Sequence, residues 1–417
     1  MEKKRIILSL IAGMIIGLSS HTIHAAELVV TYSPANLSKM YQAVADAFSA
    51  KYPDIQVTLE GSPSYGNLSE KTLRASVTKS LPDVSHEGLS YIRRYSDRNL
   101  AVPLDEFIAK DPEWTGLGLA DGVKAVGLFK GNTYAIPFAV STMTVFYNTD
   151  LVRQAGGDPD NLPSTWKGIT ALAKKIDALG KEFSGIYFDY GAGNAIAFQS
   201  LVFSQGGSMM NPDETRVTFD GPQGRWAMDI IQGFGNAGQI NMSRQQARQM
   251  FSAGKLGIYH NTSSNLGNFD RQIAGAFPYV MTPVPVAEGG RTPAAGNGMI
   301  MFAQSPEQQK AAWKYIKFAA GPEAQAIMAK MTGYVPINHK VIENPEMKAF
   351  YRSHPNYAVP LAQIDGLTAW YAFPGQNSEK IARQIMNEME NVVTLRKTAS
   401  EGLTRAAEET RRLLDLK

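Results

Sequence analysis

Aromatic rings, hydroxyls and a carboxylate recur where predicted apolar strands end, at Tyr65, Glu87, Ser141, Thr142, Ser263, Ser264, Tyr334, Trp370 and Tyr371. An aromatic face covers the apolar C–H patches of a sugar or polyol, while carboxylates and hydroxyls bind its hydroxyl groups. Together these side chains predict a site for a small, neutral polar ligand. Each aromatic residue taken alone fits a core position equally well, because large aromatic side chains are often buried.

Motifs that would build a catalytic centre or a metal site are missing from the sequence. There is no Gly-x-Ser-x-Gly elbow, no His-Glu-x-x-His pair, no Gly-x-x-x-x-Gly-Lys-Ser/Thr loop and no EF-hand. The chain has no cysteine, which excludes thiol nucleophiles, thiolate metal sites and a lipid-modified N-terminal cysteine. An exported polysaccharide hydrolase, the alternative enzyme, needs two carboxylates about 5 to 10 Å apart, and Glu87 has no evident partner. We expect no enzyme, cofactor or metal.

The first 25 residues have the pattern of an export signal. Lys3, Lys4 and Arg5 precede an apolar run from Ile6 to Leu18, and cleavage is expected after Ala25. Removing the signal takes three basic residues and one acidic residue from totals of 41 and 38, so the remaining charge is nearly balanced. A nucleic-acid partner needs a strong, clustered positive charge, so none is expected. The prediction is a free periplasmic protein.

The remaining chain, roughly 390 residues long, is too large for one hydrophobic core and predicts two domains. It opens as a strand from residue 27, an amphipathic helix over 39–52 and a strand over 55–59, an order typical of a parallel α/β sheet. The next strand, Leu81 to Val84, is expected to lead into a loop at His86 to Gly88. A crossing between domains is expected after Pro137, and residues 378–414 are predicted to be helical.

Four segments resemble family 1 extracellular solute-binding proteins, which include the maltose-binding and glycerol-3-phosphate-binding receptors of ABC importers. Residues 134–151 are similar to the family's crossing strand, which ends in Tyr-Asn-Lys/Thr-Asp-Leu. Residues 162–166 resemble its Pro-x-Thr-Trp helix start, and residues 250–258 resemble its Phe-x-x-Gly-Lys-x-Ala-Met stretch. Residues 330–337 are closest to the glycerol-3-phosphate receptors.

The resemblance implies a type II periplasmic binding protein fold, in which two hinged α/β lobes joined by crossing strands hold the ligand in a cleft. The expected N-terminal lobe is 26–137 plus 283–332, and the expected C-terminal lobe is 138–282 plus 333–417. The implied partners are a small polar ligand, such as a sugar or polyol derivative, two permease subunits and a cytoplasmic ATPase. The receptor itself is expected to be a monomer.

The resemblance also implies ligand-binding residues, which are Tyr65, Glu87, Ser141, Ser263, Gly296 and Tyr334. Tyr65 stands 17 positions before Pro82, as the ligand tyrosine of the glycerol-phosphate receptors stands before its own proline. Five of them have an ordinary structural alternative: a surface position for Tyr65 and Glu87, a hydrogen bond to the backbone for Ser141, a turn for Gly296, and core packing for Tyr334.

One departure from the glycerol-phosphate receptors concerns the ligand. They place an arginine near residues 372–376, whereas this chain has none between Arg352 and Arg383. Phosphate prefers a guanidinium fork, so the loss argues against a phosphorylated ligand. Trp370 and Tyr371 instead add aromatic area suited to a sugar ring. The hypothesis is a receptor for a neutral sugar or oligosaccharide; the alternative is a receptor for sn-glycerol 3-phosphate or a glycerophosphodiester, with Arg74 or Lys71 as the replacement cation.

Overall fold

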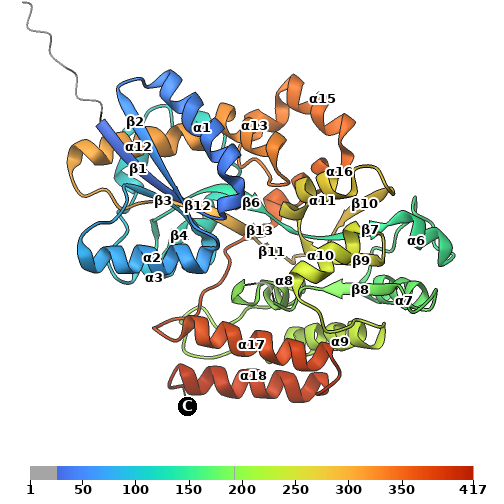
Figure 1. Ribbon diagram of the computed structural model, residues 1–417. Helices are drawn as coiled ribbons and strands as arrows, with labels where there is room; N and C mark the ends of the chain where they lie inside the picture. Colours follow the sequence, from blue (N-terminus) through green and yellow to red (C-terminus); the bar gives the residue numbers. More distant parts are fainter. Residues whose placement is uncertain (1–25, 192, 417) are drawn as a thin grey trace, which may run out of the picture.

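The computed structural model describes residues 26–191 and 193–416, and it has two α/β lobes side by side (Figure 1). The sheet of the first lobe has the strand order β2-β1-β3-β12-β6. β1 pairs in parallel with β2 and β3, and β12 runs antiparallel to β3 and β6. The strand bounds are Ala26–Tyr32 (β1), Ile55–Gly61 (β2), Val84–Gly88 (β3), Ile136–Ser141 (β6) and Ala295–Met301 (β12).

Amphipathic helices cover this sheet. In α1 (Ser38–Lys51), Met40, Val44 and Phe48 recur at four-residue spacing and are buried, as the sequence predicted. α12 (Pro306–Ala320) begins with the Ser305 cap, which accepts a hydrogen bond from the Gln308 N–H, and it contacts α1, β1 and β6. The core of the first lobe therefore combines segments from both ends of the expected N-terminal lobe.

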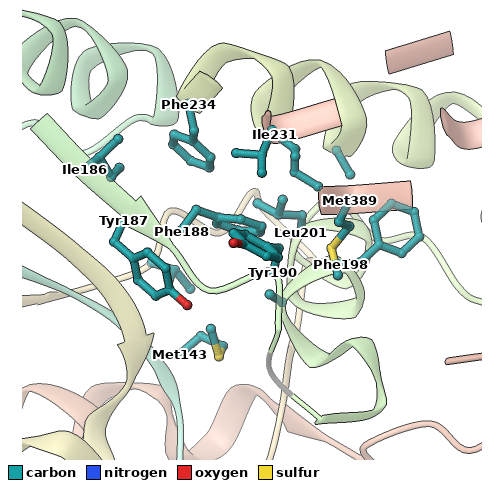
Figure 2. Close-up of a cluster of buried hydrophobic side chains, with 14 of the residues drawn as sticks. Met143, Ile186, Tyr187, Phe188, Tyr190, Phe198, Leu201, Ile231, Phe234 and Met389 are labelled. Atoms are coloured by element: carbon teal, nitrogen blue, oxygen red, sulfur yellow. The ribbon is translucent and has the colours of Figure 1, made fainter. Parts of the chain in front are cut away.

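The second lobe contains a four-stranded sheet of order β10-β7-β9-β8. Its core packs β8 against α8, α9 and α17, where Phe188, Leu201, Phe234 and Met389 meet (Figure 2). The bounds are Met143–Asn148 (β7), Ser184–Phe188 (β8), Leu256–Thr262 (β9), Tyr279–Pro283 (β10), Trp166–Asp177 (α7), Ile196–Ser204 (α8), Pro222–Asn236 (α9), Ser378–Val393 (α17) and Ala399–Leu413 (α18).

Shorter elements complete the lobes and their connections. Two small sheets pair β4 (Leu128–Phe129) with β5 (Asn132–Thr133) and β11 (Thr292–Pro293) with β13 (Leu367–Thr368). The other helices are Tyr65–Thr78 (α2), Ile92–Ser96 (α3), Asp105–Lys110 (α4), Asp121–Val126 (α5), Thr149–Gln154 (α6), Arg244–Ser252 (α10), Leu266–Ile273 (α11), Pro322–Met331 (α13), His339–Glu343 (α14), Pro345–Ser353 (α15) and Pro355–Ala358 (α16).

The chain first passes between the lobes at Thr142, between β6 and β7. β6 lies wholly in the first sheet through Ser141, so it continues beyond the lobe limit expected after residue 137. Pro137 does not end the strand, because β6 is an edge strand and one side of its backbone needs no partner. Tyr334 and Val335 also pack in the first core, although they were expected in the other lobe. The lobe limits stay a proposal, with this crossing moved to Thr142.

The loop expected at His86 to Gly88 is wrong, because these residues form the second half of β3. β3 is the central strand of its sheet, and all five of its residues are buried. The His86 ring packs against Tyr41 and Phe138, and its Nε2 lies 3.1 Å from the Tyr315 hydroxyl. Polar residues therefore occupy a buried strand, which alternation of apolar residues could not reveal.

The predicted export signal, residues 1–25, lies outside the described residues. Over 26–191 and 193–416, none of the helices combines the length and the apolar character needed to cross a membrane.

Gly296 in β12 is expected to tolerate no side chain. Its φ is 105°, and a Cβ atom there would lie 1.9 Å from the Ala139 carbonyl oxygen. We expect Gly296→Ala to lower the free energy of unfolding by at least about 1–3 kcal/mol, measured by urea denaturation. Gly116→Ala is the control, because a Cβ at Gly116 meets nothing within 4 Å. Equal stability of the two variants would contradict this account.

Candidate ligand-binding cleft

A cleft of about 910 Å³ lies where the two lobes face each other. This volume is in the range of small-molecule sites in proteins. The first lobe contributes residues 33–37, 63–66, 90 and 91; the second contributes 193, 194, 196, 244, 245, 248, 249, 261, 262, 264, 265, 268 and 272. Ser141, Ala295, Gly296, Tyr334 and Trp370 line it near the crossings. Both lobes therefore offer groups to one ligand.

Four aromatic residues line the cleft: Tyr65, Tyr91, Tyr334 and Trp370. Tyr65 begins α2, whose preceding Ser64 accepts the Asn67 N–H as the helix cap. Gly88 makes room for two of these rings, since a Cβ there would lie 3.0 Å from Tyr65 Cγ and 3.1 Å from Tyr91 Cδ2. The missing side chain on β3 thus lets two tyrosines reach the cleft.

Five of the eight predicted site residues line the cleft: Tyr65, Ser141, Gly296, Tyr334 and Trp370. Ser141 and Gly296 are neighbours there, because Ala295 pairs with Ser141 and Gly296 with Val140 across β12 and β6. Their roles in binding remain proposals. The other three residues, Glu87, Ser263 and Tyr371, do not line it.

Glu87 lies behind the cleft wall, because its side chain points from β3 toward α2. Thr72 Oγ1 and Ser85 Oγ donate hydrogen bonds to Oε1 at 2.7 and 2.9 Å. Burial raises the pKa of Glu87 to about 7, although these two hydrogen bonds oppose the rise. Glu87 is fully buried. Its hydrogen bonds join β3 to α2 behind the cleft wall, and its carboxyl group is not on the cleft surface.

Ser263 is also fully buried, at the start of the 3-10 turn Ser263–Asn265. Its backbone N–H donates to the Thr142 carbonyl oxygen at 2.9 Å. The residues on either side of it, Thr262 and Ser264, line the cleft. The predicted serine-rich loop is therefore at the site, but the residue chosen within it is displaced by one.

Tyr371 takes part in an inter-lobe bridge made by Arg93, Arg94, Glu214, Tyr371 and Glu379. Arg93 of the first lobe donates to both carboxylate oxygens of Glu214 at 2.5 and 2.6 Å, and the Tyr371 hydroxyl donates to the same carboxylate at 2.9 Å. Arg94 pairs with Glu379 of α17. Burial alone would raise the pKa of Glu214, but the hydrogen bonds from Arg93 and Tyr371 lower it below its ordinary value.

Sequence reasoning missed the cations of the cleft, Arg244 and Arg248 of α10. They are four residues apart and therefore share one helix face, beside Gln245 and Gln249 at the same spacing. That polar spacing was a usable signal. Arg74 and Lys71, the predicted replacement cations, do not line the cleft; each lies near a glutamate, at 3.8 and 2.6 Å.

Comparison with known proteins gives the family. Residues 43–359 match the model described as bacterial extracellular solute-binding protein. The chain belongs to this family. The resemblance inferred from the sequence is thereby confirmed, and relatives of this solute-binding protein are themselves binding proteins.

Two relatives differ in the ligand that they are named for. The maltotriose-binding protein of Pyrococcus abyssi is 24% identical over 327 residues, which are 75% of this chain and 66% of that protein. The sn-glycerol-3-phosphate-binding periplasmic protein UgpB of Rhizobium meliloti is 24% identical over 296 residues, 67% of each chain.

A solved structure of UgpB from Mycobacterium tuberculosis in complex with glycerophosphocholine superposes with a TM-score of 0.81 at 20% identity. The superposition covers 93% of this chain and 98% of that one. It confirms the predicted two-lobed periplasmic binding protein fold.

Glu87→Gln should change how stability depends on pH. The folded-state pKa of Glu87, about 7, is above the ordinary value of 4.5, so its full contribution is present below about pH 4.5 and is lost as the pH rises through 7. Relative to Glu87→Gln, the natural protein should lose up to roughly 3 kcal/mol of unfolding free energy over that interval. Urea denaturation at several pH values measures this.

The buried histidines do not affect the difference in unfolding free energy between the two proteins. Burial lowers the pKa of His86 and of His260 to about 3, which gives the opposite slope, but both residues are present in both proteins and cancel in the difference. A difference that stays constant from about pH 4 to 8 would show that Glu87 is not the buried acid described.

Glu214→Gln should loosen the inter-lobe bridge. A part-buried carboxylate held by a guanidinium and a hydroxyl stabilises the lobe arrangement by about 1–2 kcal/mol. Small-angle X-ray scattering of the ligand-free variant should therefore give a larger mean radius of gyration. Glu408→Gln is the control, because over residues 26–191 and 193–416 Glu408 pairs within α18, with Arg405 at 3.8 Å. Identical scattering from both variants would show that the bridge does not hold the lobes.

Proposed function

We propose that this protein is the periplasmic substrate-binding component of an ABC importer and captures a sugar or another polyhydroxylated solute. The observation that carries the proposal is the cleft between the lobes, where aromatic rings and uncharged hydrogen-bonding side chains of both lobes converge. Aromatic faces suit the C–H surface of a sugar, and amides and hydroxyls can both donate to and accept from its hydroxyl groups.

Capture follows from contacts that one ligand makes to two lobes. A ligand held by Tyr65 of the first lobe and by Thr262 and Ser264 of the second favours the arrangement in which both sets reach it. The movement is a hinge at the crossing segments, beginning with Thr142 between β6 and β7. The partners of the closed receptor are two permease subunits and their ATPase, and the receptor acts as a monomer.

The ligands named for relatives leave two classes in the proposal, oligosaccharides and glycerol phosphates. Trp370 favours the sugar class. It lines the cleft and also packs against the cores of both lobes, and its Nε1 donates to the Asn194 carbonyl oxygen at 3.4 Å. A ring fixed in this way is a rigid platform for a sugar face.

The experiment that tests the function is a thermal-unfolding screen of residues 26–417, unfolded and refolded to remove carried-over ligand, against sugars, polyols and glycerol phosphates. A ligand at about 100 times its dissociation constant adds about 2.7 kcal/mol and raises the unfolding midpoint visibly. A saturable shift for one ligand class supports the receptor function. No shift with any of them would contradict it.

Trp370→Ala should weaken binding of the ligand found by that screen by about tenfold or more, because the stacking surface is lost. Isothermal titration at a temperature where both proteins are folded measures this. The matched control is Trp226→Ala, which removes the same side chain from α9, where Trp226 packs on the second core away from the cleft. Equal affinity of the two variants would contradict the stacking role.

A further inference from the structure

The charged side chains that line the cleft are all positive. Arg244 and Arg248 are the charged residues among the described lining residues, and no aspartate or glutamate lines the wall with them. An arginine that faces a cleft with no carboxylate beside it is available to an anion that enters. The two arginines differ in this respect.

Arg244 already has a carboxylate partner. Its Nε lies 2.6 Å from Oδ2 of Asp189, and Asp189 is fully buried. The same carboxylate accepts a hydrogen bond from Asn261 Nδ2 at 2.6 Å. The charge of Arg244 is therefore balanced from behind the wall.

Arg248 has no such partner. Its Nε donates to the neutral Asn265 Oδ1 at 2.7 Å, which orients the guanidinium group. Over residues 26–191 and 193–416, no carboxylate lies within salt-bridge distance of it. The cleft wall thus carries one positive charge that the described protein groups leave uncompensated.

Hydroxyl groups from both lobes share the cleft with this charge. The side chains of Tyr65, Tyr334 and Ser264 line the same cleft as Arg248. Tyr65 belongs to the first lobe, whereas Ser264 and Arg248 belong to the second. All of them can donate hydrogen bonds, and none is anionic.

We propose that Arg248 is the specificity-determining residue of the cleft and that the ligand carries one negative charge, on a phosphodiester or a carboxylate attached to a polyhydroxylated body. The proposal rests on the receptor function proposed above and narrows its substrate class. The guanidinium fork forms charge-assisted hydrogen bonds to such an oxyanion, and the hydroxyls of Tyr65, Tyr334 and Ser264 complete its surroundings.

The count of charges favours a monoanion. With Arg244 balanced by Asp189, a single uncompensated cation matches a phosphodiester or a carboxylate, and a phosphomonoester dianion would leave one negative charge without a partner. The expectation of a neutral ligand depended on the absence of arginine between Arg352 and Arg383, but folding brings Arg248 to the cleft from another part of the chain.

The test compares neutral ligands with anions of related structure. Residues 26–417, freed of carried-over ligand, are titrated calorimetrically with glucose and glucuronate, with maltotriose, and with glycerol, glycerophosphoglycerol and glycerol 3-phosphate. We expect a monoanion, glucuronate or glycerophosphoglycerol, to bind at least about tenfold tighter than its neutral counterpart, with the preference decreasing at high salt. Which monoanion binds distinguishes the carboxylate from the phosphodiester.

Two variants assign the preference to one side chain. Arg248→Gln should reduce it to about twofold or less, through loss of affinity for the monoanion. Arg271→Gln is the control, because it removes the same charge from the neighbouring α11 outside the cleft, and it should keep the full preference.

Other outcomes separate the two proposals. If a neutral sugar binds as tightly as its acid, or if Arg271→Gln abolishes the preference as Arg248→Gln does, the role of Arg248 is overturned and the receptor function stands. If glycerol 3-phosphate binds more tightly than the phosphodiester, the proposal that the ligand carries a single negative charge is overturned. If no ligand binds at all, the receptor function itself fails.

Discussion

The hydrogen bonds around Thr142 are the constraint on which the two-lobed structure depends. Thr142 is fully buried between β6 of the first sheet and β7 of the second. Its hydroxyl donates to Gln363 Oε1 at 2.5 Å, and its carbonyl oxygen accepts the Ser263 N–H at 2.9 Å. A buried backbone carbonyl needs such a partner, because leaving it without one costs about as much as a lost hydrogen bond. One residue thus joins the crossing strand, the serine-rich turn and the distant segment around Gln363.

The cleft stays open because each lobe fills its own hydrophobic core and needs no apolar group from the other lobe. Phe188, Phe234 and Met389 fill the second lobe (Figure 2), and Tyr41, Phe138 and Tyr315 fill the first. Each sheet therefore buries its own apolar surface, and the groups left between the lobes are mostly polar or aromatic. Polar contacts such as the inter-lobe bridge help to hold the lobes together, which suits lobes that move relative to each other.

Buried polar groups explain which predicted residues line the cleft and which do not. Tyr65, Ser141, Gly296, Tyr334 and Trp370 line it, and motifs or aromatic type had singled them out. Glu87 was misplaced, since a carboxylate after an apolar run is expected in solvent, whereas the hydroxyls of Thr72 and Ser85 allow it to be buried. Tyr371 was misplaced because its partner, Glu214, is distant in sequence. Arg248 was missed, since the four-residue spacing of polar residues on α10 marks a shared helix face but does not show that this face borders the cleft.

The sequence by itself indicated most local elements through short-range periodicity and caps, and the resemblance of segments such as residues 134–151 to a known family indicated the two-lobed fold. The tertiary structure alone decided which polar side chains share the cleft and which are buried behind it. It also decided the charge of the cleft: Asp189 balances Arg244, and among the residues that the structure describes no carboxylate pairs with Arg248. Electrostatic pairing depends on distance in space and on burial, and neither can be read from spacing along the chain.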